Sequence, residues 1–273
     1  MKKILYINEL DDIDSTHLNH LLRLCEMGIE GIVHLSPRKI EGLTTAFSDD
    51  GRITKEIMCK GPYLHEILDA ADREGASVAV VSRDRGTKGP LNDRLMKHLL
   101  NKLHLPVIVF NRIEGDSGAV PEGLFHHIVF AADWTRESKA ALEYLLFNFK
   151  ERIGLLEIVN VIDARLSVRD IRHLKKKLEE TRHLFLQIGI DAEAHIYAGN
   201  PSEEIILAAK DYGATCIVMG NAYKSFIRSI FTKNAPFKVA RWAEVPSLFV
   251  PFLPYPDKPD GQAEKEDHTK QRF

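Results

Sequence analysis

The chain has 273 residues, of which 44% are hydrophobic and 28% are charged, with a formal net charge of -2. This length suits two domains of ordinary size, and the balanced charge gives no general attraction to nucleic acid or to an anionic membrane. No stretch approaches the roughly 20 apolar residues of a membrane span, and the N-terminal apolar run, which stops at Asn8, is too short for a secretory signal. We therefore expect a cytoplasmic two-domain protein with neither a nucleic-acid nor a membrane partner.

The apolar segment that opens the chain begins a pattern that occurs twice. Three segments of the first half align with the second: 3–26 with 127–150, 60–82 with 198–220, and 103–110 with 243–251. The central pair aligns without a gap and includes Gly75 opposite Gly213. Self-similarity of this kind indicates a duplicated supersecondary unit.

The second copy shows the expected elements most clearly. In chain order they are a strand at Ile128–Ala132, a helix at Ser138–Phe149, a strand at Leu155–Val161, a charged helix at about Ile171–Gln187, a helix from Asn200 to Gly213, and strands at Cys216–Met219 and Ser247–Val250. Asn200 has the character of an N-cap because Pro201 follows it and Glu203 comes three residues later. Gly213 is expected to end that helix with a positive φ.

These strands are apolar on both faces and alternate with helices, which predicts a parallel sheet covered on both sides. Ligands of such open sheets bind beyond the carboxyl ends of the strands. The sequence therefore predicts a site after Phe130, Val161 and Met219.

Four motifs carry a resemblance to a known family. The first strand of the second copy ends at the acidic Asp133, a Gly-Asn-Pro turn opens a helix at Pro201, a strand ends in Met219-Gly220, and Pro246 precedes the last strand. With these motifs the chain resembles the universal stress protein family in its tandem-domain form. The resemblance implies an α/β fold of two tandem doubly wound domains, each with a mostly parallel five-stranded sheet, of the adenine nucleotide alpha hydrolase-like type.

The resemblance also implies that the fifth strands of the two copies pair with each other, as an intramolecular pseudo-dimer. We expect an N-terminal domain at 1–112, a linker at 113–124, a C-terminal domain at 125–253 and a disordered tail at 254–273, where proline, glycine and charge replace apolar residues. Further homodimerisation of the tandem chain is left open.

In nucleotide-binding members of the family, a loop G-x2-G-x9-G-[ST] after the fourth strand wraps the phosphates, because glycines let backbone N–H groups approach the anion. The second copy keeps Gly220, but Tyr223, Lys233 and Asn234 occupy the two later glycine positions and the hydroxyl position. In the first copy the strand ends at Ser82, and the glycines that follow do not match the spacing of the loop. We expect an eroded phosphate loop in the second copy and a lost one in the first.

The remaining site residues are implied by the resemblance. Asp133 stands where family members place a base-contacting Asp, and Glu9 takes that position in the first copy. Asp133 has a second interpretation, as a loop or capping residue before the helix start at Thr135–Ser138. The candidate nucleotide-binding residues are Ala132, Asp133, Val161, Met219, Gly220, Lys233 and Asn234.

Metal and nucleophilic chemistry find no support in the sequence pattern. Cys25, Cys59 and Cys216 are widely spaced in apolar stretches, which is typical of reduced core thiols. The adjacent His126 and His127 point to opposite faces of a strand, so we assign them no role and expect no metal site.

Two functions stay open. The first is a stress-response protein that acts as a non-enzymatic binding or scaffold module with eroded nucleotide sites, and its protein partner is not identified. The second is an ATP- or AMP-binding sensor that uses the C-terminal domain and hydrolyses ATP slowly. No catalytic residue is expected in the first case, and adenine nucleotide is the ligand in the second.

Overall fold

The computed structural model describes residues 3–8, 21, 24, 28–36, 53–59, 63–84, 93–112, 123–162, 167–222 and 234–253. In the first half the elements are β1 (Lys3–Asn8), β2 (Gly31–Ser36), β3 (Ile53–Met58), α3 (Tyr63–Glu74), β4 (Val78–Asp84), α4 (Asp93–Lys102) and β5 (Val107–Arg112). The second half has β6 (His127–Ala131), α5 (Arg136–Phe149), a 3₁₀ turn at Lys150–Arg152, β7 (Leu155–Ile162), α6 (Val168–Gln187), β8 (Asp191–Ala198), α7 (Pro201–Asp211), β9 (Cys216–Ala222), α8 (Ala235–Trp242) and β10 (Ser247–Phe252).

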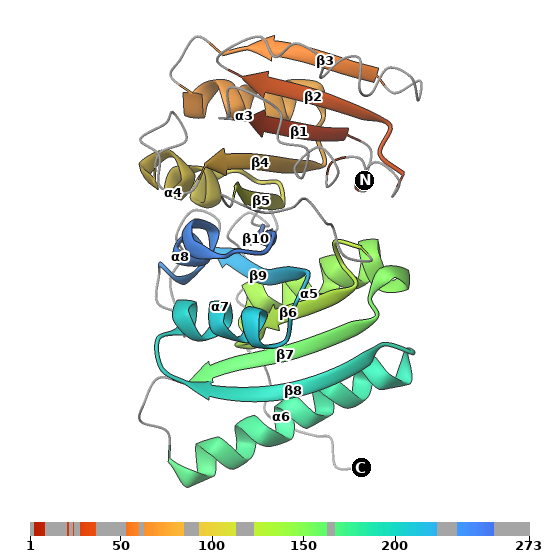
Figure 1. Cartoon of the computed structure of the whole chain (residues 1–273), viewed down its shortest axis with the longest axis vertical. Helices are drawn as coiled ribbons and strands as arrows, with labels where there is room; N and C mark the ends of the chain where they lie inside the picture. The colour runs from red at the N-terminus through yellow and green to blue at the C-terminus, as the bar shows by residue number, and fades with distance from the viewer. Residues whose placement is uncertain are drawn as a thin grey trace, which may run out of the picture.

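The strands of the described residues form one ten-stranded sheet in the order β3-β2-β1-β4-β5-β10-β9-β6-β7-β8 (Figure 1). Neighbouring strands are parallel except for β5 and β10, which pair antiparallel with Leu248 opposite Ile108. Counted from either outer edge, each half has the same strand order. The expected α/β fold class, with two doubly wound five-stranded units, is confirmed.

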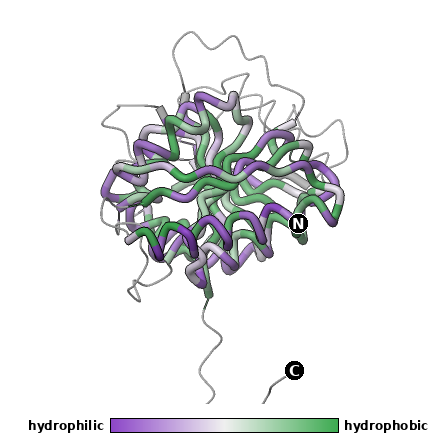
Figure 2. Tube along the Cα trace, turned by 90° about the horizontal axis from the view of Figure 1, so that it is seen from below, coloured by the Kyte–Doolittle hydropathy of each residue, from purple (hydrophilic) through white to green (hydrophobic). Residues whose placement is uncertain are grey.

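Both faces of the sheet carry a hydrophobic core that continues from one half into the other. One core includes Val81 and Val109 of the first half together with Val129 and Val159 of the second, and it packs against α3, α4, α7 and α8. The other includes residues such as Val80 and lies against α5 and α6. Figure 2 shows hydrophobic residues concentrated in the central strands between the helical layers. Burial on both faces explains why the strands are nearly continuous apolar runs.

Equivalent positions of the two halves have the same local geometry. Gly75 follows α3 and Gly213 follows α7, and both have φ of 62°, which a side chain disfavours. The hydroxyl of Ser77 donates to the carbonyl of Lys3 at 3.0 Å, and that of Thr215 donates to the carbonyl of His127 at 2.9 Å. The aligned segments therefore fold in the same way.

Two asparagines join the halves beside the β5–β10 pair. The Asn111 amide on β5 donates to the carbonyls of Ala240 and Ala243 at the end of α8, at 3.1 and 2.9 Å. The Asn221 amide on β9 donates to the carbonyl of Leu100 in the last turn of α4. Each half therefore caps the last helix of the other, because carbonyls at a helix end lack a partner within the helix.

The structure corrects the element reading in one respect. The sequence pattern alone predicted four strands in the second copy. The structure has a fifth strand there, β8, as the family resemblance implied, and it also has the helix α8 before the last strand. Of the expected linker, 113–122 lies outside the described residues, and Leu124 is buried in the core. The tail beyond residue 253 also lies outside them. Among the described helices, none combines the length and apolar character needed to cross a bilayer.

Candidate functional site

Strand register gathers five of the seven candidate residues at one edge of the sheet. Ala131 pairs with Met219 on one side and with Val159 on the other. The positions that follow these pairs are Ala132, Asp133, Gly220 and Val161, all at the carboxyl ends of β6, β9 and β7. Ala132, Asp133, Val161 and Met219 are buried. The edge is the one at which open α/β sheets bind ligands.

Asp133 is held on one side and unpaired on the other. Its Oδ1 accepts from the Thr135 amide at 3.1 Å and from the Thr135 hydroxyl at 2.6 Å, while the Thr135 hydroxyl oxygen caps α5 by accepting from the Ser138 amide. Asp133 is only 5% exposed, and its Oδ2 is buried without a hydrogen-bond partner among the described residues. Oδ1 thus holds Thr135, the N-cap residue of α5, in the turn before the helix. Oδ2 stays available to a donor.

Burial raises the pKa of the Asp133 carboxyl, and the two bonds from Thr135 oppose this shift. A buried ionised oxygen without a donor is costly. A ligand would lower that cost if one of its hydroxyl or amine groups donated a hydrogen bond to Oδ2 of Asp133. The ligand must supply the donor because an ionised carboxylate only accepts hydrogen bonds.

The residue after Asp133 has a strained backbone. Trp134 has φ of 56°, and it is the one non-glycine residue with positive φ in the part of the chain that the structure describes. Its indole nitrogen donates to the Thr181 hydroxyl on α6 at 3.4 Å, and the Lys177 ammonium lies 5.8 Å from the ring centroid. These contacts with α6 hold the sharp turn that lies between β6 and α5. Strain of this kind is concentrated at functional sites.

Gly220 has a packing role in this structure. A Cβ at this position would lie 2.3 Å from the carbonyl carbon and oxygen of Glu137 and 2.5 Å from the amide of Ser138. The start of α5 therefore presses directly on β9, and only glycine leaves room for it. The first glycine of the phosphate-loop pattern is required here by helix packing, whatever it does toward a phosphate.

The phosphate side of the expected site is described in part. Asn234 is the N-cap residue of α8, but its side chain makes no capping hydrogen bond. Lys233 and Tyr223 lie outside the described residues. The structure therefore brings together Ala132, Asp133, Val161, Met219 and Gly220, and places Asn234 at the start of a helix that packs against β9 and β10.

The matching edge of the first half has a different composition. Ser82, the counterpart of Gly220, is buried, and in the part of the chain that the structure describes its hydroxyl has no hydrogen-bond partner. Arg83 follows it with 3% exposure, and its Nη2 lies 3.3 Å from Oδ1 of Asp93. Asp93 also pairs with Arg241 of α8 in the other half. A guanidinium tied to this inter-half ion pair stands where the second copy has Asn221. Glu9 lies outside the described residues.

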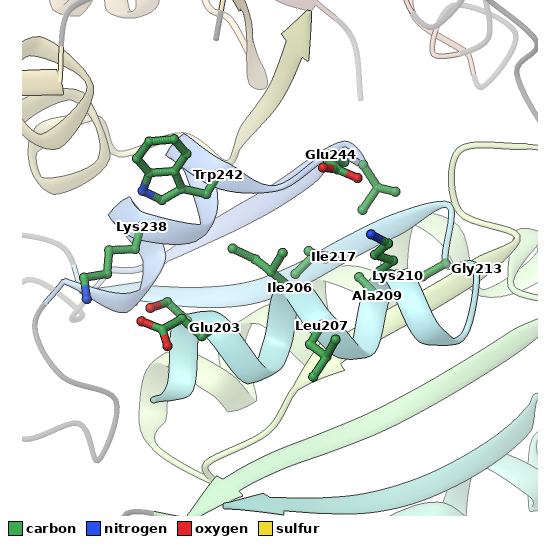
Figure 3. Close-up of a pocket in the computed structure, with 13 residues that line it drawn as sticks. Glu203, Ile206, Leu207, Ala209, Lys210, Gly213, Ile217, Lys238, Trp242 and Glu244 are labelled. Carbon is green, nitrogen blue, oxygen red and sulfur yellow. The ribbon is translucent and has the colours of Figure 1, made fainter. Parts of the chain in front are cut away.

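A cavity of about 670 Å³ lies away from this edge, between α7 and α8 (Figure 3). Ile206, Leu207 and Trp242 give it apolar walls, and Glu203 and Lys238 lie at one end. The cavity reaches Ile217 of β9 between the two helices, and its lining does not include Asp133. It is therefore separate from the predicted nucleotide edge.

Sequence reasoning missed a polar cluster on the sheet. His127, to which we assigned no role, lies with its Nε2 3.0 Å from Oε1 of Glu157. Glu157 also contacts His195. The signal in the sequence was Glu157 itself, the single charged residue in the apolar segment LLEIVNVI.

A comparison with protein-family models finds a match. The model described as Universal stress protein family matches residues 124–251, in the C-terminal half of the chain. The resemblance noted in the sequence is confirmed.

Cys59 and Cys216 are free and buried, as expected of core thiols, and Cys25 lies outside the described residues.

Solved structures show the same fold over both halves. A universal stress protein from Archaeoglobus fulgidus is 20% identical, covering 91% of this chain and 98% of its own, with a TM-score of 0.64. A protein of unknown function from Pseudomonas aeruginosa is 14% identical over 92% of each chain, with a TM-score of 0.62. A family protein from Arabidopsis thaliana with AMP bound is 21% identical over 46% of this chain and 91% of its own, and its TM-score of 0.33 is too low to transfer a ligand. No curated protein matches the chain.

Proposed function

We propose that the chain is a non-enzymatic binding module of the universal stress type. In this proposal the C-terminal half takes up an adenine nucleoside or nucleotide at the carboxyl ends of β6, β7 and β9, and the N-terminal half serves as a scaffold. The observation that carries it is the Asp133 carboxylate, buried at the end of β6 with Oδ2 unpaired. A nucleoside offers the hydroxyl and amine donors that such an oxygen lacks.

The phosphates are expected to add little affinity. Gly220 packs against the backbone of Glu137, and the sequence has Tyr223 and Lys233 where the family loop has glycine. Side chains at those positions keep backbone amides from lying close to an anion. We therefore expect adenosine, AMP and ATP to bind with similar affinity, and magnesium to matter little.

The absence of catalysis is part of the proposal. Burial raises the pKa of the Cys59 thiol to about 12 and also raises that of Cys216. Both thiols therefore stay protonated near neutral pH and are poor nucleophiles. A binding module needs only that ligand uptake alter its surface for a partner.

Calorimetry of the full-length chain with adenosine, AMP and ATP tests the proposal. Wild-type protein should bind one ligand per chain, and Asp133→Ala should weaken binding about 10- to 100-fold, the effect of one hydrogen bond to a charged group. Asp69→Ala removes an exposed carboxylate of the first half and should leave affinity unchanged. Equal affinity of the Asp133 variant and the wild type would contradict the proposed site.

A scaffold without nucleotide is the second candidate. Two observations favour it: Ala132, Val161 and Met219 are buried, and Asp93 of the first half pairs with Arg241 of the second. In that case wild-type protein gives no heat with any of the three ligands and carries no nucleotide through purification.

A further inference from the structure

A buried carboxylate lies between two imidazoles on the sheet of the second half. Glu157 is the one charged residue of β7, and it is only 2% exposed. Its Oε1 lies 3.0 Å from Nε2 of His127 on β6, and its Oε2 lies 2.6 Å from Nε2 of His195 on β8. Neighbouring strands on both sides thus supply a nitrogen to one carboxylate.

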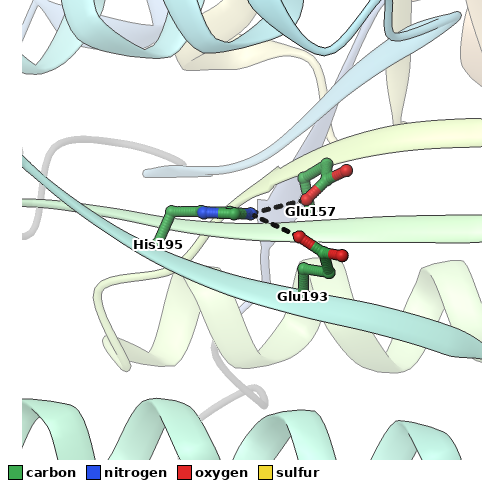
Figure 4. Close-up of side chains that lie close together, drawn as sticks. All are labelled: Glu157, Glu193 and His195. Carbon is green, nitrogen blue, oxygen red and sulfur yellow. Dashed lines mark hydrogen bonds and ion pairs between the residues drawn. The ribbon is translucent and has the colours of Figure 1, made fainter.

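A second carboxylate completes the group from the solvent side (Figure 4). Glu193 is opposite Glu157 in the β7–β8 register, and its Oε2 lies 3.8 Å from Nε2 of His195. One ligand atom each from Glu157, Glu193 and His195 lies within 4.8 Å of the others. Glu193 is 65% exposed, so the group has an opening to solvent.

Tyrosines fix the orientation of His195. Its Nδ1 lies 3.1 Å from the hydroxyl of Tyr212, whose ring stacks on the imidazole with centroids 4.6 Å apart. The hydroxyl of Tyr197 donates to that of Tyr212 at 3.1 Å. Imidazoles that bind metals are usually held in this way through the second ring nitrogen, which leaves the first to face the ion.

We infer that Glu157, Glu193 and His195 bind a divalent transition-metal ion of the zinc class, with His127 holding the second oxygen of Glu157. The mixed nitrogen and oxygen donors favour such an ion over magnesium or calcium, which prefer oxygen alone. Tetrahedral zinc with bonds of about 2.0–2.2 Å needs ligand atoms roughly 3.3 Å apart. The present separations of 2.6 and 3.8 Å bracket that value, so small side-chain movements suffice.

The site is independent of the nucleotide proposal. Glu157 and Glu193 are the third residues of their strands and His127 is the first of β6, whereas Asp133 follows the carboxyl end of β6. Three ligands leave a coordination position for water or for a group from a partner.

The test uses the metal-free full chain, without a histidine tag, titrated with Zn²⁺ by calorimetry and with Co²⁺ by visible absorption. We expect one ion per chain and cobalt bands typical of four-coordinate nitrogen and oxygen ligands. Glu193→Gln alters an exposed side chain and should weaken binding at least about tenfold without affecting the fold, and His195→Gln should abolish the stoichiometric site.

His65→Gln is the matched control. His65 also pairs with a carboxylate, Asp69 at 3.0 Å, but it is 73% exposed, and the described residues offer it no third ligand. Its loss should therefore leave Zn²⁺ affinity unchanged. The inference is overturned by a wild-type chain that binds no stoichiometric Zn²⁺, by retained affinity in both Glu193→Gln and His195→Gln, or by a cobalt spectrum of the six-coordinate aqua type. Such a result would mean that the cluster is a hydrogen-bonded ion-pair network.

Discussion

The carboxyl group of Asp133 gives a prediction about pH. Its folded-state pKa is raised by burial, so the folded chain holds this proton more tightly than the unfolded chain does. The stability contributed by the group is therefore complete below the unfolded pKa and is lost as pH rises through the folded value. In Asp133→Asn this titration is absent.

We expect the unfolding free energy of Asp133→Asn, relative to wild type, to increase as pH rises from about 4 to about 8. Urea denaturation of both proteins at a series of pH values measures the difference, and other titrating groups cancel in it. Asp69→Asn, which makes the same change at an exposed position, is the control. If the wild type instead gained stability relative to Asp133→Asn as pH rose, the fold would stabilise Asp133 as an anion.

A methyl group at position 220 should be poorly tolerated. The Cβ of Gly220→Ala would meet the backbone of Glu137 at 2.3 Å, and backbone cannot move aside as a side chain does. We expect a loss of about 3 kcal/mol or more in urea denaturation, at the upper end of overpacking effects.

Gly154→Ala is the control for this change. Its Cβ would lie 2.6 Å from Nε2 of His126, the end of a side chain that can rotate. A Gly220→Ala variant no less stable than Gly154→Ala would show that α5 can shift away from β9.

At the scale of elements, local chemistry made α7 predictable. Asn200 accepts from the Ser202 amide at 3.2 Å and donates to Glu203 at 3.0 Å, and Gly213 ends the helix with positive φ. All of these groups are close in sequence, so their pattern alone predicts the helix and its ends. The core strands were predictable for a related reason, because burial on both faces leaves an apolar run in the sequence.

Elements that depend on distant partners were not predictable from pattern. β8 reads DAEAHIYA, and all of its residues but Ala192 are partly or fully exposed because it is an edge strand, so the hydrophobic signal is weak. The cluster around Glu157 draws residues from three strands, and only their register brings the residues together. A contact of Asp133 with the start of α5 was predictable from its place just before the helix. That its Oδ2 is buried without a partner could not be predicted, because this depends on how distant residues pack around it.

The two asparagine caps predict a measurable contribution from contacts between the halves. Asn111→Ala and Asn221→Ala each leave helix-end carbonyls without their amide donor, and each should lower the unfolding free energy by about 1–2 kcal/mol. Asn148→Ala removes the same kind of bond within one half, from the Asn148 amide to the carbonyl of Tyr144 at 2.8 Å. This control should cost less, because the bond lies along one helix. Thermal and urea unfolding compare the three, and equal losses would show that the inter-half position adds nothing.

At the scale of the whole molecule, the continuous cores predict that both halves unfold together. The two tryptophans of the chain, Trp134 and Trp242, lie in the second half, so their fluorescence reports on that half, whereas far-UV circular dichroism reports on both. We expect the two signals to give one coincident urea transition. A dichroism transition that precedes or follows the fluorescence change would show that the halves are stable separately.

Isolated segments give the complementary measurement. Residues 1–112 and 124–254 would each expose the last strand and the apolar surface that the other half covers, so each should dimerise or aggregate when made alone. Monomeric segments in size-exclusion chromatography would contradict the importance of the β5–β10 pair.

The antiparallel pairing of β5 with β10 also decides how the molecule responds to dilution. Two separate chains that met through these strands would come apart as their concentration fell, but here a covalent connection keeps the partners at a fixed effective concentration. The ten-stranded sheet therefore persists at the lowest abundance of the protein in a cell. The covalent connection also allows the sequence of one half to change while the other half maintains the shared sheet. One chain can therefore carry two unlike surfaces in a constant one-to-one ratio.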